Sequence, residues 1–333
     1  MGPLPAKKVL TELLPIKPAT SPALIDVVFI HGLDGNAVST WNDGKGESWS
    51  DWISASFPGA NIWSLSYRLH SSNWVGGSMP LTDRALNVLA TIQSAIVGDR
   101  PFVFICHSYG GLLLKQMLRT SRDIAPEYRE VTDRIKGVVF LATPHNGSAI
   151  ARYVQALRVL RSGPAIKELE SNAALLRDLN QWFRKNVNIK GLRVRAYFET
   201  INTKGIRVVD EDSADPVIDG VVAVGIDADH IAICKPPEQD VRVKQTLALI
   251  GDVLREREQR VPNVEPSYIR TALACRFEDL ERLKREIELY RKDRPEDAEA
   301  KQALLYIAGV RILGPTCGKY VTKAMRTVLQ FLK

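Results

Sequence analysis

A serine at the end of an apolar run is the residue of this sequence best suited to nucleophilic chemistry. In PFVFICHSYGG, residues 101–111, four apolar residues lead into a cluster around Ser108, and a helical pattern, LLLKQML, starts at residue 112. This order is typical of a strand, a sharp turn and a helix, which presents the serine at the apex. The motif is G-x-S-x-G with Cys106 at the first position. It predicts a serine that forms an acyl-enzyme.

A serine nucleophile needs a base, and the chain has five histidines. His31 and His107 lie at two predicted turns, His70 lies in a predicted loop, and His145 follows the strand after the serine. Where such a serine follows a strand of a parallel sheet, the triad runs in the order serine, acid, histidine. His230 follows the last predicted strand, so we expect it to be the base. His107, next to the nucleophile, is interpreted as a brace for the turn.

The acid that orients the base is expected after the strand that precedes the last one. The predicted strand LRVRAYF, residues 192–198, ends directly before Glu199. Glu199 is therefore the first choice. Asp210, Asp212 and Asp215 lie in the same connection and remain alternatives.

The negative oxygen of an acyl-transfer intermediate needs two backbone N–H donors. One is expected from Tyr109, directly after the nucleophile, and the other from Leu33 in the turn HGLDG. His31, Gly32 and Gly110 are expected to support these two turns, since glycine allows close approach of the backbone to a ligand.

Apolar, β-branched segments alternate with helical patterns along residues 24–257. This alternation predicts an α/β fold with a doubly wound, mostly parallel sheet. An edge strand is expected within residues 7–16, and a helix over 81–97 with Thr82 as its N-cap. The buried strands are predicted at residues 24–30, 60–67, 102–105, 135–142, 192–198 and 221–226.

Six motifs occur in one order: VVFIHGLDGNAVSTW, FICHSYGG, FLATPHNGS, YFET, VVDEDSA and DADHIAICKP. With them the chain resembles the serine-active-site-containing lipase-like family of α/β-hydrolases, which is related to phosphatidylglycerol-remodelling proteins and GPI inositol-deacylases. The resemblance covers roughly residues 9–257. It implies an enzyme acting on acyl esters, often of lipids, that needs no cofactor or metal. It places Ser108 and His230 at the nucleophile and base positions, and Glu199, in the ET motif, at that of the acid.

A change in composition near residue 262 predicts two domains. Residues 1–261 are expected to form the α/β-hydrolase domain, with a cap-like helical insertion at about 149–190. Residues 267–333 contain no strand pattern and are expected to form a small all-α segment. It serves either as an oligomerisation or partner-binding module or as a stabilising appendage packed on the hydrolase domain.

The net charge of +7 comes from basic residues interspersed with acidic ones, which does not indicate a nucleic-acid-binding surface. Together with a tryptophan-rich segment, it predicts peripheral contact with an anionic membrane. No run of 18 apolar residues and no secretory signal are present, and the four cysteines are scattered, so a cytoplasmic location is expected. The tryptophans of that segment are Trp41, Trp49, Trp52, Trp63 and Trp74.

These observations favour a serine esterase or lipase-like hydrolase that cleaves acyl esters, with lipids as the expected substrates. An alternative is an acyltransferase of phospholipid remodelling, in which an alcohol instead of water accepts the acyl group. A further alternative is an effector whose hydrolase activity is controlled by assembly through residues 267–333.

Overall fold

The computed structural model describes residues 11–42, 44, 46–67, 79–145, 147–160, 169–170, 173–186 and 192–260. The chain divides into two compact units, residues 1–257 and 258–333. Apart from the end of one helix, the second unit lies outside the described residues, and so does the helical segment expected over 267–333.

A seven-stranded sheet forms the centre of the first unit, with the strand order β1-β3-β2-β4-β5-β6-β7. β1 pairs antiparallel with β3 at one edge, and every other pairing is parallel. The predicted doubly wound, mostly parallel sheet is therefore confirmed. The strands are β1 (Glu12–Lys17), β2 (Ile25–Ile30), β3 (Ala60–Ser66), β4 (Phe102–His107), β5 (Ile135–Leu141), β6 (Arg193–Glu199) and β7 (Ala223–Ile226).

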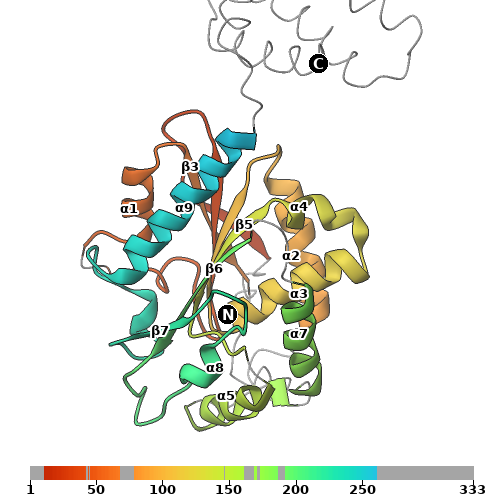
Figure 1. Cartoon of the computed structure of the whole chain (residues 1–333), viewed down its shortest axis with the longest axis vertical. Helices are drawn as coiled ribbons and strands as arrows, with labels where there is room; N and C mark the ends of the chain where they lie inside the picture. The colour runs from red at the N-terminus through yellow and green to blue at the C-terminus, as the bar shows by residue number, and fades with distance from the viewer. Residues whose placement is uncertain are drawn as a thin grey trace, which may run out of the picture. The chain divides into compact units, whose positions relative to one another are not determined.

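Helices cover both faces of this sheet, with α1 and α9 on one face and α2, α3, α4 and α7 on the other (Figure 1). Every residue of the central strands β2 and β4 is buried, which explains why their sequences are apolar except for Asp26 and His107. The helices are α1 (Trp49–Ser56), α2 (Leu81–Ala95), α3 (Tyr109–Asp123), α4 (Arg129–Asp133), α5 (Gly147–Leu160), α7 (Ala173–Asn186), α8 (Glu211–Ala214) and α9 (Val241–Arg260), with 3-10 turns at Pro126–Tyr128 and Ala232–Cys234.

Helix α2 begins differently from the prediction. Its N-cap is Pro80, and Thr82 lies inside the first turn. Proline has no backbone N–H, and none is needed at this position because the first N–H groups of a helix have no partner within the helix. A threonine can act as the N-cap only if it stands before the first helical residue. The prediction for Thr82 was therefore wrong by two residues.

The tryptophan-rich segment contributes mainly to the core. Trp41, Trp49 and Trp52 are buried in the main hydrophobic cluster, and the indole of Trp63 donates a hydrogen bond to Asp26. Trp74 lies outside the described residues. The first three side chains are consequently not exposed to a membrane surface, so the prediction of membrane contact loses this part of its basis.

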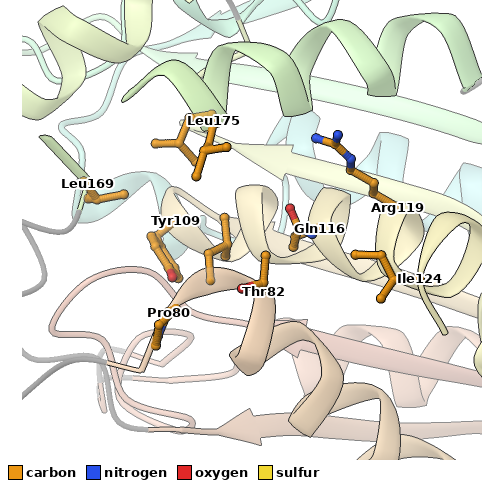
Figure 2. Close-up of a pocket in the computed structure, with 10 residues that line it drawn as sticks. Pro80, Thr82, Tyr109, Gln116, Arg119, Ile124, Leu169 and Leu175 are labelled. Carbon is orange, nitrogen blue, oxygen red and sulfur yellow. The ribbon is translucent and has the colours of Figure 1, made fainter. Parts of the chain in front are cut away.

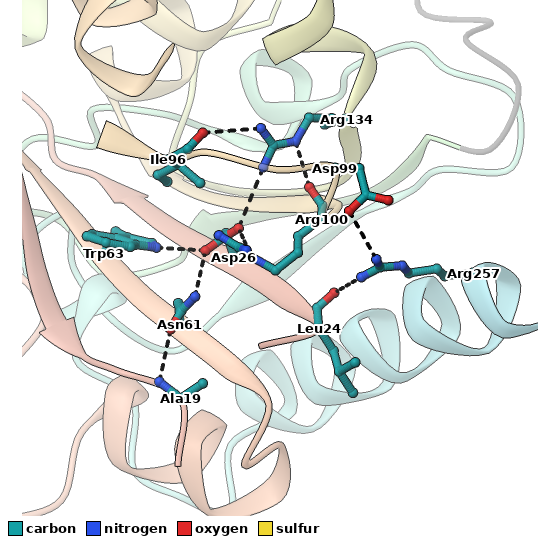
Figure 3. A network of polar contacts seen from close by, with 10 residues as sticks. All are labelled: Ala19, Leu24, Asp26, Asn61, Trp63, Ile96, Asp99, Arg100, Arg134 and Arg257. Carbon is teal, nitrogen blue, oxygen red and sulfur yellow. Dashed lines mark hydrogen bonds and ion pairs between the residues drawn. The ribbon is translucent and has the colours of Figure 1, made fainter. Parts of the chain in front are cut away.

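A buried carboxylate ties the amino-terminal ends of the central strands together (Figure 3). Asp26 on β2 has no exposed surface and pairs with Arg100 at 2.8 Å and with Arg134 at 3.7 Å. It also accepts hydrogen bonds from Asn61 and Trp63 on β3. Four partners compensate for the loss of hydration of the buried charge, so the network stabilises the amino-terminal ends of these strands. Leu33 and Ser108 follow the opposite, carboxyl-terminal ends of β2 and β4.

Within the described residues, none of the helices combines the length and the apolar character needed to cross a membrane.

Candidate active site

Ser108 occupies a strained turn between β4 and α3. Its backbone dihedrals are φ 53° and ψ −120°, a region that non-glycine residues rarely adopt. The turn is held by a 2.9 Å hydrogen bond from the Ser108 N–H to the carbonyl of Leu141 and by the Thr143 hydroxyl, which donates to the Ser108 carbonyl. Such strain costs about 1–3 kcal/mol and persists where surrounding contacts enforce it. The structure therefore has the predicted strand, sharp turn and helix.

Two glycines permit the close packing of this turn. A Cβ atom added at Gly110 would collide with the carbonyl oxygens of Ile30 and His31 at the end of β2. One added at Gly32 would lie 2.9 Å from the Cβ of Ser108. Because neither glycine has a side chain, the loop after β2 can pack directly against the turn that carries Ser108. This is the role expected of both glycines.

Cys106, the departure from the usual motif, is accommodated within β4. It is fully buried and pairs in regular register with Ile30 of β2 and Phe140 of β5. Burial raises the pKa of its thiol well above the usual value, so the group stays protonated and unreactive.

The three side chains expected to act together lie in one hydrogen-bonded line. Nε2 of His230 is 3.1 Å from Oγ of Ser108, and Nδ1 of His230 is 3.3 Å from Oε2 of Glu199. Glu199 is completely buried at the end of β6, and His230 is nearly so after β7. This is the arrangement in which a carboxylate orients an imidazole that faces a hydroxyl.

The backbone fixes the orientation of the Glu199 carboxylate. Its second oxygen, Oε1, accepts hydrogen bonds of 2.8 Å and 2.7 Å from the N–H groups of Val208 and Val209. The two atoms of the carboxylate therefore have separate partners, two backbone donors on one side and the imidazole on the other.

The alternative acids have other positions. Asp210 is the N-cap of α8, where it accepts a hydrogen bond from the Ser213 N–H and pairs with Arg152. Burial raises the pKa of Asp210, but the Ser213 bonds and the Arg152 charge outweigh this effect and lower it. Asp212 is exposed, and Asp215 accepts a hydrogen bond from the Val217 N–H. Glu199, not these aspartates, is the acid in contact with His230.

Two residues position the loop that carries His230. The ring of His107 donates through Nε2 to the backbone carbonyl of His230 at 2.9 Å, and the two rings lie 4.8 Å apart. The hydroxyl of Thr203 accepts the His230 N–H at 2.9 Å. His107, which was expected to brace the turn, therefore contacts the loop of His230. Thr203 was not predicted, since only the fold brings residues 203 and 230 together.

The predicted oxyanion donors flank Ser108. Tyr109 follows it as the first residue of α3, and Leu33 lines a small cavity of about 80 Å³ beside it. The loop that carries Leu33 is fixed by His31, whose carbonyl accepts the Tyr67 hydroxyl and whose ring stacks on Tyr67 at 4.3 Å. The other residues that line this cavity are His107, Ser108, Leu157, Thr203, Lys204, His230 and Ile231.

Helix α5, in the region predicted as a cap, adds a residue that sequence reasoning missed. The hydroxyl of Tyr153 lies 2.8 Å from Oγ of Ser108, and the side chain is completely buried. Leu157, one turn further along α5, lines the same small cavity as Ser108. A tyrosine in a helical segment carries no local signal of such a contact, because the contact spans 45 residues of sequence.

A buried lysine and histidine lie near the nucleophile turn. Lys115 on α3 donates to the side-chain oxygen of Asn180 at 2.6 Å, and the ring of His145 packs edge-on against Phe140. Among the described residues, neither ring nitrogen of His145 has a hydrogen-bond partner. Burial, together with the charges of Lys115 and Arg184, lowers the pKa of His145 well below its usual value.

A second, apolar cavity of about 220 Å³ lies between α2, α3 and α7 (Figure 2). Tyr109 lies at one end of the cavity, and Arg119 and Ile124 lie at the other. Tyr109, the residue after Ser108, contributes to this cavity, whereas Ser108 and His230 line the smaller one. The remaining lining residues are Pro80, Leu81, Thr82, Gln116, Leu169, Leu175 and Leu176.

No cluster of three or more histidine, cysteine, aspartate or glutamate side chains suited to hold a metal ion occurs in the part of the chain that the structure describes.

Comparison with known proteins places these features in a family. Residues 27–301 match the sequence profile described as the alpha/beta hydrolase family. Protein SERAC1 of Danio rerio is 32% identical over an alignment 268 residues long, which covers 71% of this chain and 40% of that protein. Protein SERAC1 of Homo sapiens is 31% identical over 264 residues, with the same two shares. The chain therefore spans less than half the length of these curated relatives.

Among solved structures, one of two fungal esterases from Rhizomucor miehei has 14% sequence identity and a TM-score of 0.46, with 74% of this chain and 79% of that chain covered. The family match and the sheet together confirm the α/β-hydrolase fold that the motifs predicted.

Proposed function

Because the chain belongs to the α/β hydrolase family, we propose that it is a serine ester hydrolase that forms an acyl-enzyme on Ser108. The observation that carries this proposal is the line of contacts from Glu199 through His230 to Oγ of Ser108, at 3.3 Å and 3.1 Å. The strained turn that presents the serine gives independent support.

The contacts define the protonation pattern that the reaction needs. Glu199 accepts from Nδ1–H of His230, which leaves Nε2 as the acceptor for the Ser108 hydroxyl. His230 removes this proton as Oγ attacks the ester carbonyl, and then returns it to the departing alcohol. Water, activated by the same imidazole, hydrolyses the acyl-enzyme in the second half of the reaction.

The oxyanion is stabilised by the N–H groups of Tyr109 and Leu33. Such donors contribute most where water is excluded, and Ser108 is nearly completely buried. Removal of one donor of this kind typically costs a factor of about 10²–10³ in kcat.

The apolar cavity beside Tyr109 supports an ester with a long acyl chain as the substrate. Its lining includes Leu81, Leu169, Leu175 and Leu176. A cavity of about 150 Å³ already accommodates benzene in another protein, so this one is large enough for several methylene groups. Burial of each methylene contributes about 0.8 kcal/mol, which would favour lipid esters over short ones.

The proposal is tested with a fluorophosphonate probe, which phosphonylates an activated serine. The wild-type chain should be labelled and should hydrolyse p-nitrophenyl esters, and Ser108→Ala should do neither while it retains its unfolding temperature. Ser121→Ala is the matched control, since this buried serine on α3 bonds to Thr132, away from the site. Labelling of the Ser108→Ala variant at the wild-type rate would refute the assignment of the nucleophile.

A further inference from the structure

Of the two side chains whose hydrogen bonds to Ser108 are described above, Tyr153 is the nearer. Its hydroxyl lies 2.8 Å from Oγ of Ser108, nearer than Nε2 of His230 at 3.1 Å. The ring is fully buried on α5, and the ester hydrolysis described above assigns it no role.

The direction of this hydrogen bond follows from the neighbouring contacts. Glu199 accepts from Nδ1 of His230, so Nε2 accepts the Ser108 proton. The Ser108 oxygen therefore has lone pairs left as acceptors, and the hydroxyl of Tyr153 donates to it.

The backbone of Tyr109 acts on the same phenol. A backbone hydrogen bond from Tyr109 lowers the pKa of Tyr153, as an N–H donor does, although burial outweighs it. This N–H is the group expected to bind the carbonyl oxygen of an ester. A substrate carbonyl oxygen that binds the Tyr109 N–H would therefore be a neighbour of the Tyr153 hydroxyl.

We propose that the Tyr153 hydroxyl is a third donor to the oxyanion, beside the N–H groups of Leu33 and Tyr109. This proposal rests on the ester hydrolysis proposed above. Tyr153 is a catalytic residue in this assignment because it contacts the reacting oxygen.

The reaction balances without a proton from Tyr153. As the bond between Oγ of Ser108 and the carbonyl carbon forms, the carbonyl electron pair moves to oxygen and the serine proton moves to His230. The bond to the leaving alcohol then breaks, and His230 protonates that alcohol. Oγ and the oxyanion share one carbon, so a hydroxyl that donates to the first oxygen is close to the second. Burial and the Glu199 charge raise the pKa of Tyr153, so the phenol keeps its proton and acts as a donor.

The decisive variant is Tyr153→Phe, which keeps the ring and removes the hydroxyl. We expect kcat for p-nitrophenyl butyrate to fall by about 10²-fold, the typical cost of one lost oxyanion donor, with KM changed by less than about threefold. The inhibition constant of an aryl trifluoromethyl ketone, which forms an oxyanion on the serine, should rise in proportion. Tyr197→Phe is the matched control, because that hydroxyl donates to Gln245 instead, and it should leave both values unchanged.

Replacement of Tyr153 by 3-fluorotyrosine keeps the hydroxyl and makes it a stronger donor. This variant should retain at least the wild-type kcat, and should also bind the trifluoromethyl ketone at least as tightly. If Tyr153→Phe fails to fold, this variant still distinguishes hydrogen-bond donation by the hydroxyl from packing of the ring.

Two results would overturn the assignment. An unchanged or increased kcat in Tyr153→Phe would mean that the hydroxyl only obstructs the site, and unchanged ketone inhibition would exclude contact with the oxyanion. A wild-type chain that neither hydrolyses esters nor accepts the fluorophosphonate would instead refute the proposed function itself.

Discussion

Glu199→Gln is the substitution for which the structure gives the sharpest prediction. The glutamine oxygen has to remain at Oε1, since the N–H groups of Val208 and Val209 donate there. The reverse orientation would point the amide NH₂ at two buried donors, each of which costs about 1–3 kcal/mol when unsatisfied. The NH₂ group therefore faces Nδ1 of His230, where the carboxylate oxygen stood.

This orientation inverts the tautomer of the base. Nδ1 has to accept from the amide, so the proton moves to Nε2, and Nε2 can no longer accept the Ser108 proton at 3.1 Å. The same inversion in a serine protease lowers kcat by about 10⁴-fold, which corresponds to about 5 kcal/mol of activation free energy. We expect this loss here, with the unfolding temperature within about 4 °C of wild type because all backbone hydrogen bonds are kept.

Steady-state hydrolysis of p-nitrophenyl butyrate and thermal unfolding measure the two quantities. Glu199→Ala gives the contrast, since it removes the acceptor of two buried N–H groups and should lower the free energy of unfolding by about 2–6 kcal/mol. Asp210→Asn is the control, because Asp210 caps α8 and should leave kcat within about threefold. A kcat of Glu199→Gln within tenfold of wild type would refute the orientation argument.

Three further predictions concern stability and specificity. Asp26→Asn should lower the free energy of unfolding, measured in urea, by about 3–5 kcal/mol, because it leaves two arginines without their buried partner. A loss below about 1 kcal/mol would contradict the stabilising role of this network. His145 is neutral in the fold and its pKa is lowered, whereas the unfolded chain binds a proton there below about pH 6.5. Stability is therefore lost as pH falls below that value, by at most about 1.4 kcal/mol per pH unit. His145→Phe should lose less stability between pH 7.5 and pH 5 in urea titrations, and an equal loss would count against this role. Thr82→Phe should narrow the apolar cavity and slow hydrolysis of p-nitrophenyl decanoate more than hydrolysis of p-nitrophenyl acetate. Asn87→Phe, at an exposed position of the same helix, should slow neither reaction. Equal effects of Thr82→Phe on both esters would exclude the cavity as the acyl site.

The local patterns of the sequence were sufficient for the strands, the helix order and the nucleophile turn. An apolar run that ends in a serine, with two glycines shortly after it, specifies a strand and a turn through contacts between near neighbours, so Ser108 could be placed before its surroundings were known. The order of the strands then pointed to His230, since the carboxyl ends of parallel strands lie along one edge of the sheet. The same reasoning could not choose firmly between Glu199 and Asp210, because both follow the strand that precedes the last one.

Tertiary structure shows which of these carboxylates contacts His230, and it adds what the sequence could not indicate. The choice of Glu199 depends on the N–H groups of Val208 and Val209, which only the folded connection brings to its carboxylate. Tyr153 reaches the nucleophile from a helix whose sequence differs little from any other amphipathic helix. The sequence by itself therefore determined the kind of fold and the position of Ser108 at the turn after β4. The side chains that contact Ser108 come from residues far apart in the chain, and their positions depend on packing of the whole domain.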